Sequence, residues 1–290
     1  MKKSRKLATL GICSALFLGL AACQQQHATS EGINQRQSSS AKVPWKASYT
    51  NLNNQVSTEE VKSLLSAHLD PNSVDAFFNL VNDYNTIVGS TGLSGDFTSF
   101  THTEYDVEKI SHLWNQKKGD FVGTNCRINS YCLLKNSVTI PKLEKNDQLL
   151  FLDNDAIDKG KVFDSQDKEE FDILFSRVPT ESTTDVKVHA EKMEAFFSQF
   201  QFNEKARMLS VVLHDNLDGE YLFVGHVGVL VPADDGFLFV EKLTFEEPYQ
   251  AIKFASKEDC YKYLGTKYAD YTGEGLAKPF IMDNDKWVKL

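Results

Sequence analysis

The stretch Val224-Gly225-His226-Val227-Gly228-Val229-Leu230-Val231 decides the fold class, because it is an almost unbroken apolar run with turn residues on either side. It belongs to the second of three β-rich runs, and the other two are Met208 to His214 and Phe237 to Leu243. The connections at residues 215–219 and 232–236 hold the Asp, Asn, Gly and Pro that favour turns. Three such runs in succession predict an antiparallel β-meander.

The residues before the meander have a helical period. Ser57-Thr58-Glu59-Glu60 predicts a capping box that opens a helix through about Leu69, and Pro71 opens a second helix. Residues 136–184 are acidic and predict irregular structure with one short helix. The remaining predicted helices span residues 104–117, 126–135, 169–175 and 186–202, and one more follows Ser256. Helices followed by a β-meander predict an α+β fold.

Residues 1–22 have the parts of a bacterial export signal. A positive n-region with Lys2 and Arg5 precedes the apolar stretch Leu7 to Leu20, which is too short to span a bilayer comfortably. Leu20-Ala21-Ala22-Cys23 is typical of a lipoprotein cleavage site, at which lipid is added to the thiol of Cys23. We therefore expect an extracytoplasmic protein anchored to the cell membrane through Cys23; an ordinary secretory signal or a membrane anchor is the alternative.

The rest of the chain divides into a tether and a domain. Residues 23–42 are rich in Gln and Ser, which predicts a flexible tether. Residues 43–290 predict a single domain, and a composition of 41% hydrophobic residues is enough for a core. Loss of the four positive charges of the signal takes the net charge from -9 to -13. That balance argues against a nucleic acid partner, which requires a basic face.

Three cysteines remain in the predicted domain, at positions 126, 132 and 260. Cys126 and Cys132 are six residues apart on one predicted helix, a rise of about 9 Å that is too long for a disulfide. Either all three thiols are free or Cys260 bridges one of the others. Cys126 lies in the first turn of its helix, where the helix dipole and unpaired N–H groups favour the thiolate. It is the candidate nucleophile, and a buried packing thiol is the structural alternative.

A thiolate nucleophile requires a general base, and His226 is the best candidate because a polar ring in a core-like strand needs a reason. The glycines beside it leave room for another backbone or a substrate. Glu241 in the next strand is the candidate group to orient the imidazole. The connection between the strands decides whether they meet: an even number of loop residues places both on one face, and a five-residue loop without a bulge separates them. A satisfied core histidine and an exposed edge-strand glutamate are the alternatives.

No metal or cofactor is expected. His102, His112, His189 and His214 stand in polar surroundings without metal-ligand spacing, which predicts surface positions. The acidic run with Asp153, Asp155 and Asp158 invites a calcium interpretation. It lacks the glycine and the terminal glutamate of an EF-hand loop, so we expect a solvated turn.

A cysteine at a helix start after the Gly-containing turn Gly123-Thr124-Asn125, followed by a strand reading Gly-His-Val-Gly-Val-Leu-Val, resembles the NlpC-type papain-like cysteine hydrolases. Gly123 to Tyr131 and Leu238 to Tyr249 also resemble an uncharacterised family of Gram-positive lipoproteins. The resemblance implies a papain-like fold, with N-terminal helices packed on the meander and residues 136–205 as an insertion. It also implies Cys126 as the nucleophile that attacks an amide carbonyl, His226 as the base and Glu241 as the orienting group.

The chain departs from that pattern at the nucleophile. Asn125-Cys126-Arg127-Ile128 stands where NlpC-type enzymes commonly have Asp-Cys-Ser-Gly. The Cys126 N–H supplies one oxyanion donor, and Asn125 or a tyrosine such as Tyr84 or Tyr105 is the candidate second donor. Asp120 stands where papain-like proteases keep a Gln donor, and an ionised carboxylate there would repel an oxyanion.

The sequence thus predicts a surface lipoprotein that acts as a cysteine-dependent amide or peptide hydrolase or transferase. The substrate, inferred from the location, is a cell-wall peptide stem or a short extracellular peptide. The competing interpretations are a non-catalytic envelope lipoprotein that keeps the fold and binds a ligand or partner, and a structural chaperone of the envelope.

Overall fold

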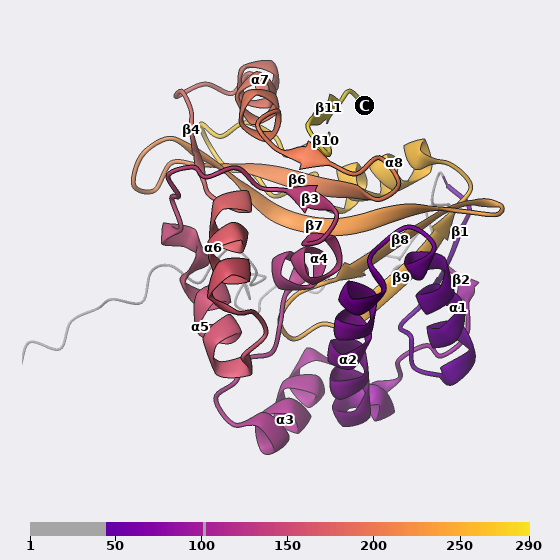
Figure 1. The fold of residues 1–290 in the computed structure, drawn as a ribbon. Coiled ribbons are helices and arrows are strands. Elements are labelled where there is room, and N and C mark those ends of the chain that lie inside the picture. Colours follow the sequence, from indigo (N-terminus) through magenta and orange to yellow (C-terminus); the bar gives the residue numbers. More distant parts are fainter. Residues whose placement is uncertain (1–44, 101–102) are drawn as a thin grey trace, which may run out of the picture. The chain divides into compact units, whose positions relative to one another are not determined.

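Strands β6, β7 and β8 form the centre of the molecule in the computed structural model, which describes residues 45–100 and 103–290. Within these residues a nine-stranded sheet runs in the order β11-β10-β6-β7-β8-β9-β1-β2, with β4 paired to β7 and every pairing antiparallel (Figure 1). Strands β3 and β5 pair separately. The strands are β1 (Ala47–Thr50), β2 (Thr98–Ser99), β3 (Val138–Thr139), β4 (Val178–Pro179), β5 (Gln201–Phe202), β6 (Arg207–Asp215), β7 (Tyr221–Ala233), β8 (Gly236–Lys242), β9 (Tyr249–Phe254), β10 (Phe280–Asp283) and β11 (Lys286–Val288).

Eight α-helices accompany the sheet in the described part of the chain. They are α1 (Gln55–Ser66), α2 (Pro71–Val88), α3 (Val107–Lys118), α4 (Cys126–Leu134), α5 (Phe151–Gly160), α6 (Ser165–Leu174), α7 (Val186–Phe197) and α8 (Lys257–Lys267). Short 3₁₀ turns lie at Gly89–Thr91 and Gln148–Leu150. The predicted α+β class and the predicted meander β6-β7-β8 are both confirmed.

Alternation along the strands creates two apolar layers. Val227, Val229 and Val231 of β7 belong to the larger core, which they share with apolar side chains of α1 to α7. Leu230 of β7 and Phe239 of β8 point the other way, into a smaller core closed by α8. Since side chains of a strand alternate between the two faces, the sheet is covered by α8 on one face and by the remaining helices on the other. Figure 1 shows α4 lying across β7 on the many-helix side.

The connection between β7 and β8 settles the register that the sequence left open. Ala233 pairs with Gly236, so the turn consists of the two residues between them. An even turn length with Val229 opposite Val240 puts His226 and Glu241 on the same face, the one covered by α8.

Some predicted elements differ from the structure. Helix α1 begins at Gln55, three residues earlier than the predicted capping box implies, because Asn54 and not Ser57 is the N-cap: its side chain accepts the Ser57 amide at 2.9 Å. Residues 136–184 contain two α-helices, α5 and α6, where the sequence predicted one. Helix α7 is shorter than predicted, and β5 takes its last two residues.

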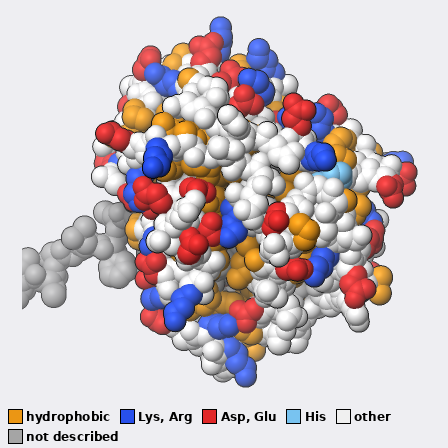
Figure 2. All heavy atoms as spheres, in the orientation of Figure 1, with side chains coloured by type: hydrophobic (Ala, Val, Ile, Leu, Met, Phe, Trp, Pro, Cys, Tyr) orange, Lys and Arg blue, Asp and Glu red, His pale blue; other side chains and the backbone are white. Residues whose placement is uncertain are grey.

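The described residues, 45–100 and 103–290, belong to one compact unit. The search for a helix long and apolar enough to cross a membrane, made over the described residues, found none. On the face drawn in Figure 2, acidic and basic side chains are interspersed, without a continuous basic surface on that face. The predicted signal, the tether and Cys23 lie outside the described residues.

Candidate functional site

Cys126 is the first residue of α4, as predicted. Asn125 is the N-cap: its backbone is extended, and its side chain accepts the Ile128 amide at 3.1 Å. Gly123 makes the turn before it with a φ of 91°, a left-handed conformation that suits glycine. The sulfur therefore lies at the positive end of α4, where a thiolate is favoured.

A buried ion pair ties this helix start to β7. Arg127 binds Asp153 of α5 in a bidentate geometry, at 2.9 Å through Nε and 2.7 Å through Nη2. Its third nitrogen, Nη1, donates to the carbonyl of Val224 at 3.0 Å. Val224 precedes His226 by two residues. The Arg127–Asp153 pair, called the clamp here, therefore holds the strand that carries the imidazole against the helix that carries the thiol.

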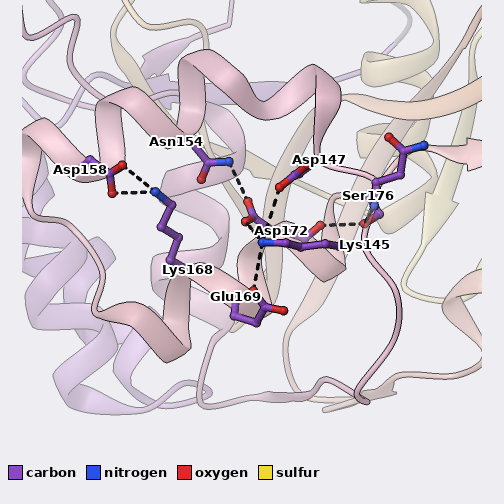
Figure 3. A network of polar contacts seen from close by, with 9 residues as sticks. Lys145, Asp147, Asn154, Asp158, Lys168, Glu169, Asp172 and Ser176 are labelled. Atoms are coloured by element: carbon purple, nitrogen blue, oxygen red, sulfur yellow. Dashed lines mark hydrogen bonds and ion pairs between the residues drawn. The ribbon is translucent and has the colours of Figure 1, made fainter.

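Asp153 is itself held in place by the packing of α5 on α6. Lys145 bridges Asp172 of α6 at 2.7 Å and Glu169 at 3.0 Å, and Asn154 of α5 donates to Asp172 at 3.0 Å (Figure 3). The segment that the sequence assigned to an insertion thus contributes a residue to the site. The prediction of a turn at residues 153–158 is wrong, because they lie on α5. Asp155 and Asp158 are exposed as expected, but Asp153 is fully buried.

The structure brings together the three residues that the sequence singled out. The thiol of Cys126 and the ring of His226 lie close enough together to shift each other's pKa. Nε2 of that ring contacts Oε2 of Glu241 at 2.5 Å. The order thiol, imidazole, carboxylate is the arrangement that a nucleophile, its base and an orienting group require.

The charges of this row reinforce one another. Burial raises the pKa of Cys126, but the charge and hydrogen bond of His226 outweigh it and hold that pKa below the ordinary value. Burial lowers the pKa of His226, but Cys126 and Glu241 outweigh it and raise that pKa. Each group thus shifts the pKa of the other toward its charged form, thiolate for Cys126 and imidazolium for His226.

Glu241 is held as an anion by α8. Its Oε1 accepts hydrogen bonds from the Tyr263 hydroxyl and from Lys267 Nζ, the latter at 3.4 Å. Burial opposes ionisation, but Lys267 and His226 bring the pKa of Glu241 down to about 2. Sequence reasoning missed Tyr263 and Lys267. Their spacing of four residues on the helix that Ser256 caps was the one available signal.

Lys242, the residue after Glu241, is a second buried charge that sequence reasoning missed. Its Nζ donates to the carbonyls of Thr244 at 2.7 Å, Phe245 at 3.1 Å and Glu247. Burial lowers the pKa of Lys242 to about 7, against the attraction of nearby acidic groups. The lysine thereby anchors the loop between β8 and β9 at the edge of the site.

The glycines beside His226 accommodate neighbouring side chains. A Cβ on Gly225 would lie 2.3 Å from Leu213, and one on Gly228 would lie 2.3 Å from Phe239. The expected room for a backbone or a substrate is therefore filled by packing. Gly225 is also the extra residue of a β-bulge, since Val211 pairs with His226 and its neighbour in β6 skips to Val224.

The oxyanion role expected for Asn125 has no support in the geometry. Its Oδ1 caps α4, and its Nδ2 donates to Asp153 at 2.8 Å, so the side chain serves the helix start. Asp120, which the sequence placed near an oxyanion, pairs with Lys159 at 3.0 Å and is highly exposed. Its carboxylate therefore lies in solvent, where it is screened.

The two candidate tyrosines are also engaged. Tyr84 donates to the carbonyl of Glu246 in the loop after β8. The Tyr105 hydroxyl accepts the side-chain amides of Asn51 at 2.9 Å and Gln250 at 2.7 Å. Neither hydroxyl hydrogen-bonds Cys126 or His226 within the described residues.

The other cysteines are buried packing residues. Cys126, Cys132 and Cys260 are all free, which settles the alternatives that the sequence left open. Burial raises the pKa of Cys132 to about 12 and that of Cys260 well above the ordinary value. Only the thiol of Cys126 has a lowered pKa among these three.

The expectation of surface histidines is half wrong. His112 is exposed, but His189 and His214 are buried with their rings 4.4 Å apart. His102 lies outside the described residues. No cluster of three or more metal-ligating side chains occurs in residues 45–100 and 103–290.

The site is closed to solvent. Cys126 is 5% exposed and His226 is 2% exposed. A cavity of about 10 Å³ beside Gly123 and Thr124 holds at most one water, and Cys126 is not part of its lining. A larger hollow of about 410 Å³ lies between Lys145, Arg177 and α7, away from the thiol.

The comparison with protein families finds one match. Residues 48–288 match the family described as a domain of unknown function (DUF4300), which is most of the chain. The searches of curated proteins and of solved structures returned no match. The chain belongs to the DUF4300 family.

Proposed function

We propose that the domain is a cysteine-dependent hydrolase or transferase of amide or peptide bonds, with the papain-like arrangement that the sequence resembles. The supporting observation is the row in which Cys126 and His226 shift each other's pKa and His226 hydrogen-bonds Glu241. Its three members come from α4, β7 and β8, so packing of separate elements is needed to assemble it.

In the proposed reaction the Cys126 thiolate attacks the carbonyl carbon of an amide, and the carbonyl oxygen becomes an oxyanion. The backbone N–H of Cys126 is one donor for that oxyanion, because an amide in the first turn has no acceptor within its own helix. The His226 imidazolium then gives its proton to the leaving amine, and a thioester remains on Cys126. Water or an acceptor amine, deprotonated by His226, attacks the thioester and restores the thiol.

Burial of the thiol favours a second candidate, a non-catalytic binding protein in which Cys126 is a packing residue. The two candidates differ in the reactivity of that thiol. The enzyme requires Cys126 to alkylate in the folded state with a midpoint well below about 8.5, the ordinary value of a free thiol. Labelling that occurs only after denaturation supports the binding protein.

Turnover is the direct test. The whole chain is incubated with cell-wall peptide stems and with short peptides, and released amines are measured by mass spectrometry. Cys126→Ala should abolish release, whereas Cys132→Ala, a matched change at a buried thiol on the same helix, should leave it near the wild-type level. Equal activity of the two variants would refute the proposed nucleophile.

We further propose that the protein is extracytoplasmic and held to the cell membrane by lipid on Cys23, as its N-terminal sequence suggests. Labelled fatty acid should be incorporated into the wild-type protein and not into Cys23→Ala. Incorporation into both, or recovery of the wild-type protein free of membranes, would refute the anchor.

A further inference from the structure

We propose that the segment from Tyr268 to Ala277, called the strap here, is an autoinhibitory lid whose Tyr268 ring occupies the space that a substrate must take above His226. The lid would control access to the Cys126 thiol. Its inhibitory role rests on the proposed function, whereas its opening does not. The strap joins the end of α8 to β10.

A stack of three rings leads from the site to solvent. The Tyr268 ring lies on the His226 ring with centroids 4.8 Å apart and an angle of 24° between the planes. Tyr271 packs edge-on against Tyr268 at 5.2 Å. The exposed fraction rises along the stack, from 2% for His226 to 8% for Tyr268 and 47% for Tyr271. The two tyrosines are therefore the layer between the imidazole and solvent on this side.

Tyr268 also interacts electrostatically with the Cys126 sulfur. Burial, and after it the charges of Glu241 and of the Cys126 sulfur, raise the pKa of Tyr268 well above its ordinary value. Lys267, which binds Glu241, lies 5.5 Å from the centroid of the same ring. Movement of Tyr268 would therefore uncover the His226 ring, the group that couples with the Cys126 thiol.

The strap has the features of a segment that opens locally. Its residues from 269 to 275 are exposed, and Gly275 has a φ of 78°. Hydrogen bonds run within it, from the Thr272 hydroxyl to the Ala277 carbonyl at 3.1 Å and from the Leu276 amide to Gly273 at 3.2 Å. Such a loop can leave the body as a unit at a lower free energy than global unfolding.

The far end of the strap is fixed. The Ala277 amide donates to Nδ1 of His214 at 3.1 Å, and Nε2 of that buried ring contacts Glu220 at 2.7 Å. Ala277 is 2% exposed. The exposed part of the strap is therefore bounded by α8 on one side and by this anchor on the other.

The test is the rate at which iodoacetamide labels Cys126, read by peptide mass spectrometry in the whole chain. Tyr268→Ala should label at least about tenfold faster than wild type, since removal of the ring lowers the free energy of exposure. Tyr268→Phe should label like wild type, because the ring stack is kept.

Tyr261→Ala is the matched control. Tyr261 is on α8 and is 8% exposed, like Tyr268. Its hydroxyl donates a hydrogen bond to Asp283, which is not one of the three site residues. Its loss should leave the labelling rate unchanged in the folded protein. The proposed lid would be refuted if Cys126 in Tyr268→Ala were labelled at the wild-type rate, or if Tyr261→Ala accelerated labelling equally.

A second measurement uses wild type alone and holds even if Tyr268→Ala does not fold. Labelling through local opening should depend weakly on low urea concentrations, whereas labelling through global unfolding should have the full denaturant dependence of unfolding. Labelling with the full denaturant dependence of unfolding would refute the proposal that the strap opens locally. Neither measurement needs a substrate, so a Tyr268→Ala protein that labels fast yet releases no amine would refute the hydrolase and leave the proposed lid supported.

Discussion

Arg127 donates a hydrogen bond to the carbonyl of Val224, and through it the residue after the thiol is joined to the strand of the imidazole. The same guanidinium is paired with Asp153, whose side chain is 1% exposed. The distance between nucleophile and base therefore depends on a residue of α5, a helix that carries neither of them.

Asp153→Asn should destabilise the protein and loosen the site. Removal of the carboxylate charge takes the bidentate partner from the largely buried Arg127 guanidinium, a loss of about 3 kcal/mol or more in the free energy of unfolding. Asp158→Asn on the same helix breaks an exposed ion pair with Lys168 and should cost far less. Urea unfolding of both variants checks this. Equal losses of unfolding free energy in the two variants would show that the buried Arg127–Asp153 pair contributes no more to stability than an exposed ion pair.

Glu241→Gln should raise the pH midpoint of Cys126 alkylation. The amide keeps a hydrogen bond to His226 but carries no charge, so the imidazolium loses stabilisation and in turn stabilises the thiolate less. An opposite charge at this range is worth about one pKa unit or more. The reaction of Cys126 with iodoacetamide across pH measures the midpoint. Glu246→Gln, an exposed change in the next loop, is the control, and an unmoved midpoint in Glu241→Gln would contradict the assigned coupling.

Lys242→Met should remove a pH dependence of stability. Lys242 has a pKa of about 7 in the folded chain against 10.5 ordinarily. The unfolded chain therefore binds the proton more strongly, and the contribution of Lys242 to the free energy of unfolding rises with pH between these values.

The difference in unfolding free energy between wild type and Lys242→Met should accordingly grow by about 1.4 kcal/mol per pH unit from pH 7 to 9. Denaturant titrations at several pH values measure it. Lys253→Met, on the neighbouring strand with a surface ion pair to Glu60, is the control and should give a constant difference. A constant difference for Lys242→Met as well would show that the ammonium is retained across this range.

Gly228→Ala should be poorly tolerated. The added methyl would lie 2.3 Å from the Phe239 ring and 2.8 Å from the Val240 carbonyl, so strand β8 has to move. Overpacking of this kind costs about 1–3 kcal/mol. Gly265→Ala meets only the end of the Leu290 side chain at 2.6 Å and should be close to neutral. Thermal unfolding of the two variants measures the difference in stability. An unchanged unfolding temperature in Gly228→Ala would show that β8 can shift at little cost.

The sequence predicted the parts of the site that local patterns encode. The start of α4 follows from the Gly-Thr-Asn turn, and the meander follows from apolar runs separated by turn residues. His226 and Glu241 stood out because each is a polar residue among apolar neighbours. These features depend on propensities within a few residues and on the period of the strand, so they can be read without a fold.

The remaining parts depend on contacts between distant segments. Asp153 sits in an acidic run that looks solvated, and only the packing of α5 reveals its partner Arg127. Tyr268 follows the end of α8 and acquires its role from the strand that carries His226. The outer strands β1, β10 and β11 have three or four residues each, too few for a period to be recognised, and they are defined by their partners in the sheet.

The hairpin between β7 and β8 reverses direction over Asp234 and Asp235 alone. One residue added there would rotate every later side chain of β8 by half a turn, so that Glu241 would face α4 and the lysine after it would face α8. Two added residues would restore the original orientation. The length of a surface turn, counted as odd or even, thus governs whether the imidazole keeps its carboxylate, and relatives that vary in this turn should do so in steps of two.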